Sequence, residues 1–132
     1  MSDQRREVER EAIFEAPPSE VWRALTDDDM LAEWLAEDAE VEAVPGGDVS
    51  FGCGDDERRG TVQRVEEERS FAFTWARPGE DETLVEFTLE PAVTGTRLVV
   101  IERTLAGPVA LSGLQWTSRL TSLATALTLV AA

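Results

Sequence analysis

Between Glu40 and Leu105 apolar residues recur at every second position, and this alternation limits the chain to a sheet of short strands. The segments between the strands are short and rich in turn-forming residues, as in PGG, GDDERRG, ARPGEDE and PAVTG. A parallel pair of strands needs a crossover of about a dozen residues or more, which these segments cannot supply. The pattern therefore predicts an antiparallel meander of about six strands, in which GDDERRG is a hairpin loop.

Helical segments flank the meander. Residues 8–15 predict a first strand, Pro18 fits the start of a short helix that runs to about Leu25, and a second short helix begins at Thr26 or Asp27. The two short helices therefore lie between the first strand and the meander.

Residues 109–132 predict a long C-terminal helix with one apolar stripe, formed by Trp116, Leu120, Leu123, Leu127 and Val130. Such a stripe is buried only if the helix packs on the concave face of the curved sheet. We therefore expect one α+β domain over residues 1–132, with residues 1–7 as a disordered N-terminal segment. Its curved antiparallel sheet has about six to seven strands, two short helices follow strand 1, and the long helix lies on the concave face.

The charge of the chain excludes several classes of partner. It holds 27 acidic residues against 12 basic ones, all of them arginine, and its net charge is −15. This charge repels phosphate backbones and anionic lipid, so we expect neither nucleic acid nor a membrane as partner. The N-terminus is charged where a signal peptide would be apolar, and Cys53 is the only cysteine, so we expect a cytoplasmic protein without an internal disulfide.

Few residues suit catalysis. The chain has no histidine, lysine or tyrosine, so acid–base chemistry would fall to carboxylates or to the thiol of Cys53. On its strand, Cys53 is more typical of a small apolar filler than of a nucleophile. The acidic runs 27–29 and 55–57 lack the ligand spacing of a calcium loop. We predict no catalytic residue, no metal and no cofactor.

Phe71, Phe73 and Trp75 lie two positions apart, so their rings leave the same face of one strand. Two interpretations are open. The rings fill an ordinary core, or they line a cavity that holds another molecule. The pattern alone does not separate them.

The order of several motifs resembles a known family. These are APPSEVWRALTDDDMLAEWL, the glycines 46 and 47, FTW at 73–75, TLVEFTLEP at 83–91, GTRLVV at 95–100 and LQWTSRL near the C-terminus. Over roughly residues 8–130 the chain is similar to the START-like or SRPBCC superfamily, and in particular to the branch named after the activator of heat-shock protein 90 ATPase. The resemblance implies a helix-grip fold, in which the sheet and the long helix enclose a mostly apolar cavity.

On this resemblance we expect the cavity to be lined by Trp34, Leu35, Phe51, Phe71, Phe73, Trp75, Val85, Phe87, Leu89, Leu98, Val100, Glu102, Trp116 and Leu120. The family often carries histidine at the position of Glu102, and this chain departs from that. A carboxylate there needs a partner. It binds a hydroxyl or amine of a ligand, or it pairs with Arg103 or Arg119.

The leading functional hypothesis is non-enzymatic binding of a small hydrophobic molecule in this cavity. One alternative is a protein-interaction module that acts on a chaperone ATPase or a regulatory partner, as the family name suggests. Another is a cyclase or hydrolase that uses carboxylates in the cavity. Residues 111–132 carry a single charge, Arg119, so the outer side of the last helix is covered by a second subunit, as in a homodimer, or is simply neutral.

Overall fold

The computed structural model describes residues 7–105 and 113–131. Most of the predicted disordered segment, residues 1–6, lies outside the described residues, while Glu7 begins the first strand. The elements are β1 (Glu7–Phe14), α1 (Pro18–Thr26), α2 (Asp28–Trp34), β2 (Asp38–Val41), β3 (Asp48–Cys53), β4 (Asp56–Glu66), β5 (Ser70–Trp75), β6 (Thr83–Ala92), β7 (Gly95–Thr104) and α3 (Gly113–Ala131).

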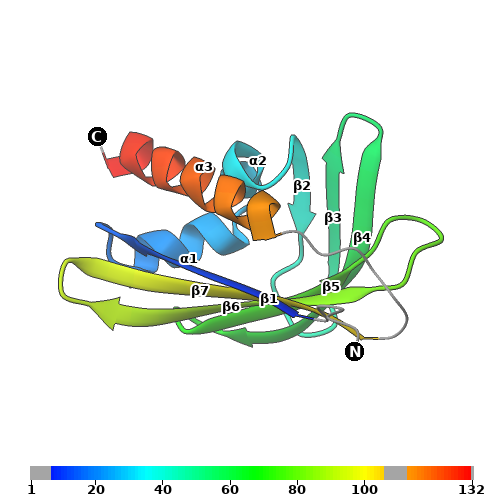
Figure 1. The fold of residues 1–132 in the computed structure, drawn as a ribbon, viewed down its shortest axis with the longest axis horizontal. Coiled ribbons are helices and arrows are strands. Elements are labelled where there is room, and N and C mark those ends of the chain that lie inside the picture. Colours follow the sequence, from blue (N-terminus) through cyan, green and yellow to red (C-terminus); the bar gives the residue numbers. More distant parts are fainter. Residues whose placement is uncertain (1–6, 106–112, 132) are drawn as a thin grey trace, which may run out of the picture.

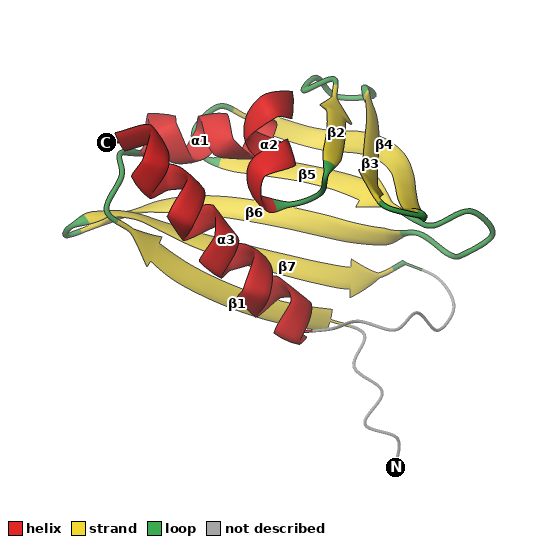
Figure 2. Cartoon of the chain, turned by 90° about the horizontal axis from the view of Figure 1, so that it is seen from above, coloured by secondary structure: helices red, strands yellow, loops and turns green. Residues whose placement is uncertain are grey.

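The seven strands form one antiparallel sheet in the order β1-β7-β6-β5-β4-β3-β2. All three helices lie on the same face of this sheet, and α3 runs diagonally above β6, β7 and β1 (Figures 1 and 2). The predicted α+β arrangement is confirmed, with two short helices after the first strand and a long helix over the curved sheet. None of the described helices is long and apolar enough to cross a membrane.

Local sequence explains the short helices. Pro18 stands at the first position of α1, where its missing N–H costs no hydrogen bond. Asp27 caps α2, because its carboxylate accepts hydrogen bonds from the backbone N–H groups of Asp29 and Met30. Of the two predicted caps, Asp27 is the one that the structure uses.

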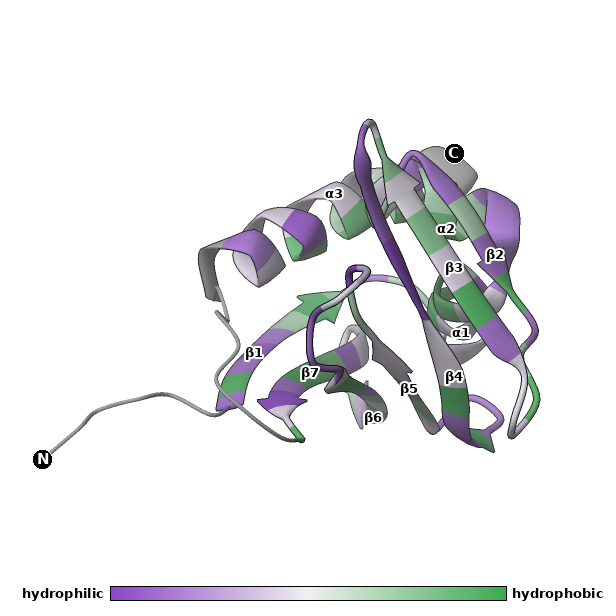
Figure 3. Cartoon of the chain, turned by 90° about the vertical axis from the view of Figure 1, so that its right-hand side faces the viewer, coloured by the Kyte–Doolittle hydropathy of each residue, from purple (hydrophilic) through white to green (hydrophobic). Residues whose placement is uncertain are grey.

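The β3–β4 hairpin differs from the prediction. Its turn is confined to residues 54–55, and β4 begins at Asp56, so most of the predicted loop GDDERRG is strand. This half of β4 rises away from the rest of the sheet and is coloured hydrophilic in Figure 3. This part of the strand buries few apolar side chains, so its sequence lacks the alternation of apolar and polar residues that indicates a strand. Its charged residues are therefore typical of a loop sequence.

The sheet bends along β4. Its first half, 56–61, pairs with β3, and its second half, 62–66, pairs with β5. At the bend a Cβ atom on Gly60 would lie 1.7 Å from the carbonyl oxygen of Thr74. Only glycine allows the two backbones to approach this closely. The bend turns the β3–β4 hairpin upward toward α3 (Figure 1).

We therefore predict that Gly60→Ala lowers the free energy of unfolding by about 2–3 kcal/mol, because the added methyl group forces the backbones of β4 and β5 apart. Urea denaturation followed by tryptophan fluorescence measures this change. Gly52→Ala is the matched control, because a Cβ atom there would meet no atom closer than 3.9 Å. Equal stability of the two variants would contradict the role given to Gly60.

Candidate functional site

Aromatic rings fill the space between the sheet and the helices. Phe73 lies at their centre, with ring centroids 5.5 Å from Phe51, 5.6 Å from Phe71, 5.5 Å from Trp75 and 6.0 Å from Phe87. Spacings of this kind are typical of favourable edge-to-face and tilted ring pairs. In this part of the interior the rings therefore contact one another.

Two helices add rings to this network. Trp116 of α3 stacks on Trp75 at 6.2 Å and meets Phe87 edge to face at 5.9 Å. Trp34 of α2 meets the other side of the network, 6.0 Å from Phe87, and its indole N–H donates to the carbonyl of Ala24 at 2.8 Å. The network thus joins α2 and α3 to the central strands.

All fourteen residues that the sequence assigns to the cavity are buried, none of them more than 7% exposed. The structure therefore brings the predicted set together in one interior. Their role in holding a ligand stays a prediction.

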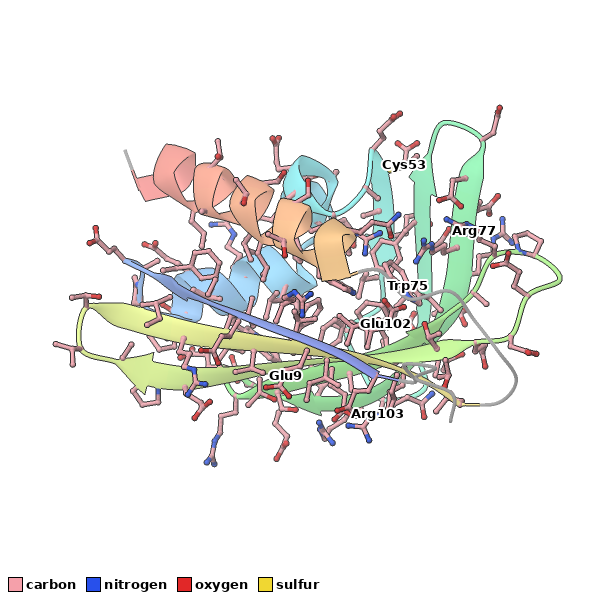
Figure 4. All side chains as sticks on the ribbon, viewed as in Figure 1. Glu9, Cys53, Trp75, Arg77, Glu102 and Arg103 are labelled. Atoms are coloured by element: carbon pink, nitrogen blue, oxygen red, sulfur yellow. The ribbon has the colours of Figure 1, made fainter. Side chains whose placement is uncertain are left out.

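Glu102 of β7 is the charged residue in this interior, and it is 6% exposed. Its Oε2 atom accepts hydrogen bonds from the indole N–H of Trp75 at 2.9 Å and from the hydroxyl of Thr83 at 2.6 Å. Its Oε1 atom accepts from the indole N–H of Trp116 at 2.8 Å. One carboxylate therefore joins β5, β6, β7 and α3 beneath the N-terminal half of α3 (Figure 4).

These partners correct the pairing expected for Glu102. Neighbouring residues of a strand point to opposite faces, so Arg103 lies on the far side of the sheet (Figure 4) and pairs with Glu86 at 2.9 Å. Among the described residues, Arg119 makes no ion pair with Glu102. The sequence contained one indication of the actual donors: a buried indole N–H usually needs a hydrogen-bond acceptor, and the sequence predicts tryptophans in the same interior as Glu102.

Two arginines lie against the outer side of the tryptophan pair. The Cζ atom of Arg58 is 4.5 Å from the ring centroid of Trp75, and that of Arg119 is 5.3 Å from Trp75 and 4.7 Å from Trp116. Both are half-buried. Burial, and then the charge of Arg58, lower the pKa of Arg119, while Glu102 is the first of the groups that oppose this shift. The guanidinium remains charged at neutral pH.

The β3–β4 hairpin is attached beside these arginines by an ion pair. Asp56 accepts two hydrogen bonds from Arg77, at 2.7 and 3.2 Å, and the hydrogen bond from Arg77 lowers the pKa of the Asp56 carboxyl. Cys53, at the end of β3, is exposed. The interpretation of Cys53 as an apolar core filler is wrong, because this end of the hairpin extends beyond the core.

A groove of about 310 Å³ separates β1 from α3. Apolar groups make up most of its lining, which consists of Arg10, Glu11, Ala12, Ile13, Phe14, Thr117, Leu120, Thr121 and Ala124. Leu120 belongs to the predicted cavity set, so the groove reaches the predicted interior from the β1 side. The other lining residues are ones that sequence reasoning missed, because a groove between the first strand and the last helix depends on how distant segments pack and has no local pattern.

Comparisons with known proteins agree with this geometry. A protein MLL2253 from Mesorhizobium loti is 24% identical with a TM-score of 0.85, over 93% of this chain and 97% of that one. DynU16, a protein of the dynemicin biosynthetic locus, is 27% identical with a TM-score of 0.81, over 94% of this chain and 48% of that one. The Aha1 dimer from Colwellia psychrerythraea is 21% identical with a TM-score of 0.78, over 92% and 95%. No curated protein matches the chain.

The sheet, the long helix that it grips and the buried interior between them define a START-like, or SRPBCC, domain. The model of the family described as "Activator of Hsp90 ATPase homolog 1-like protein" matches residues 15–128. The chain belongs to this family.

The Glu102 hydrogen bonds generate a stability prediction. Glu102→Ala leaves two buried indole N–H groups and one hydroxyl without an acceptor, and we expect the free energy of unfolding to fall by about 3 kcal/mol or more. Glu102→Gln keeps one acceptor oxygen and should lose about half as much. Urea denaturation gives the free energies, and near-ultraviolet circular dichroism reports the Trp75–Trp116 stack.

The matched control is Glu90→Ala, because Glu90 is exposed on β6 and forms only a surface ion pair with Arg97. Its loss should change the free energy by less than about 1 kcal/mol. If Glu102→Ala were no more destabilised than Glu90→Ala, the carboxylate would not join the sheet to α3.

Proposed function

We propose that this domain binds a small hydrophobic molecule between the sheet and α3 and catalyses no reaction. The observation that carries the proposal is the groove between β1 and α3. Its volume of about 310 Å³ is at the lower end of the range typical of ligand pockets. Ala12, Ile13 and Ala124, none of them buried, provide apolar surface there, and covering such surface is worth roughly 25 cal/mol per Å².

The state of Glu102 argues against catalysis. Both of its oxygens accept hydrogen bonds from protein donors, at 2.6–2.9 Å, so a substrate would compete with Trp75, Thr83 and Trp116 for it. A general base must reach the proton that it removes. Glu102 is instead surrounded by the side chains that it holds in place.

One of the similar structures supports a small organic ligand. DynU16 belongs to a locus for the biosynthesis of dynemicin, and it is similar to this chain over almost the whole domain. Binding of a biosynthetic intermediate or product is one use of an apolar groove of this size.

The test uses N-phenyl-1-naphthylamine, a neutral apolar dye whose fluorescence rises in an apolar site. We expect saturable binding to the wild-type protein. Ala124→Phe fills the groove and should weaken binding at least about tenfold, because the dye loses the apolar surface that it covers. Ser122→Phe is the matched control, because Ser122 is exposed on α3 and does not line the groove. Absence of saturable binding, or equal loss in both variants, would refute the proposal.

A second candidate is association through the outer side of α3. The exposed residues described there are mainly serine, threonine and alanine, as in Ser118, Ser122 and Thr125. The similar protein from Colwellia psychrerythraea is a dimer, and the family description names an activator of a chaperone ATPase. Light scattering of the wild-type protein and of Ser122→Phe distinguishes this candidate. A monomeric mass for both would remove the homodimer, and a chaperone partner would then need its own binding assay.

A further inference from the structure

Arg58 and Arg119 are half-buried and have no ionic partner among the described residues. Five of the described arginines form ion pairs with carboxylates, namely Arg59, Arg64, Arg77, Arg97 and Arg103. Within the part of the chain that the structure describes, neither Arg58 nor Arg119 has a hydrogen bond or an ion pair. Arg10, Arg23 and Arg69 also form no ion pair, but only Arg58 and Arg119 among the described arginines lie over an indole ring.

Geometry places the two guanidinium groups around one ring. Both lie within 5.3 Å of the ring centroid of Trp75, Arg58 from β4 and Arg119 from α3. Each lies over an indole ring, and its N–H groups donate no hydrogen bond to another described side chain. Two cations at one ring repel each other, and an anion bound between them would lower the electrostatic energy of the pair.

The charges nearby compensate only in part. Glu102 supplies one buried negative charge behind the indoles. The carboxylate of Asp56 is occupied by Arg77. Apart from the Asp56–Arg77 pair, which is neutral as a whole, two guanidinium charges lie near the single negative charge of Glu102, so one positive charge is left over. A ligand with a single negative charge neutralises this remaining positive charge. A doubly charged phosphate would instead leave a net negative charge at the site.

We propose that Arg58 and Arg119 bind the carboxylate of a small organic monocarboxylate on the outer side of the Trp75–Trp116 stack. The planar fork of each guanidinium matches a carboxylate, and the two half-buried guanidinium groups, not the buried indoles, are the groups that a ligand reaches. Burial lowers the pKa of Arg119 because it removes water from the charged guanidinium, and a bound anion would offset that cost.

This site is separate from the groove of the proposed function. Its arginines come from β4 and α3, whereas β1 and α3 line the groove, and β1 and β4 are not neighbours in the sheet. The anion site can therefore fail while the groove binds a neutral ligand, and the reverse also holds.

The experiment compares naphthalene-1-acetate with naphthalene-1-acetamide, which have the same shape but differ in charge. Both are titrated into ¹⁵N-labelled protein in about 0.15 M salt, where surface charges are screened beyond roughly 8 Å. We expect the acid to shift the indole N–H resonances of Trp75 and Trp116 saturably. The amide should bind at least about tenfold more weakly, because it offers the arginines no charge-assisted hydrogen bond.

Variants assign the effect to the two arginines. Arg58→Gln and Arg119→Gln should each weaken binding of the acid at least about tenfold. Arg69→Gln removes the same charge from an exposed residue in the turn between β4 and β5, and should leave the affinity within about twofold. If Arg119→Gln does not fold, Arg58→Gln alone decides, because Arg58 comes from the hairpin and not from α3.

Three outcomes would overturn the inference. The acid and the amide bind equally well, the acid gives no saturable shift at millimolar concentration, or the acid binds as tightly to Arg58→Gln as to the wild-type protein. Each of these outcomes concerns only the arginine site. Binding of N-phenyl-1-naphthylamine in the groove is measured independently, so the two proposals are judged separately.

Discussion

The carboxylate of Glu102 is the interaction on which the arrangement of the interior depends. A charge in an apolar interior is costly unless hydrogen bonds compensate it, and here three donors do so from β5, β6 and α3. These hydrogen bonds fix both indoles and therefore their stacking. The hydrogen bond from Trp116 to Glu102 also ties α3 to the sheet. The two fixed indoles then form the surface against which Arg58 and Arg119 lie.

The two flanks of α3 differ in a way that bears on function. Toward the β3–β4 hairpin the helix is held by Trp116, whose ring and N–H group are both engaged. Toward β1 it leaves the groove above Phe14. Under the proposed function, an apolar molecule would bind on the β1 flank of α3 while the central ring network stays intact.

Much of the fold could be predicted from the sequence, because it follows from local periodicity. Most of the strands, the cap at Asp27 and the stripe of α3 are encoded within a few residues, whereas the first half of β4 carries no such signal. The hydrogen bonds of Glu102 are not, because they join residues 14, 19 and 27 positions apart, and no period connects them. The same holds for Arg58 and Arg119, which only the bend at Gly60 and the placing of α3 bring to one ring. The fold family came from resemblance, and the partners of the buried carboxylate required the structure.

Hydrogen exchange of the four indole N–H groups, followed by NMR, tests the central role of Glu102 most directly. Trp34 donates to the carbonyl of Ala24 and provides an internal standard for a buried, bonded indole, whereas Trp22 is half-buried. In the wild-type protein Trp75 and Trp116 should exchange as slowly as Trp34. In Glu102→Ala, which removes both acceptor oxygens, both should exchange faster while Trp34 is unchanged. Exchange of Trp75 and Trp116 at the rate of Trp22 in the wild-type protein would contradict the account.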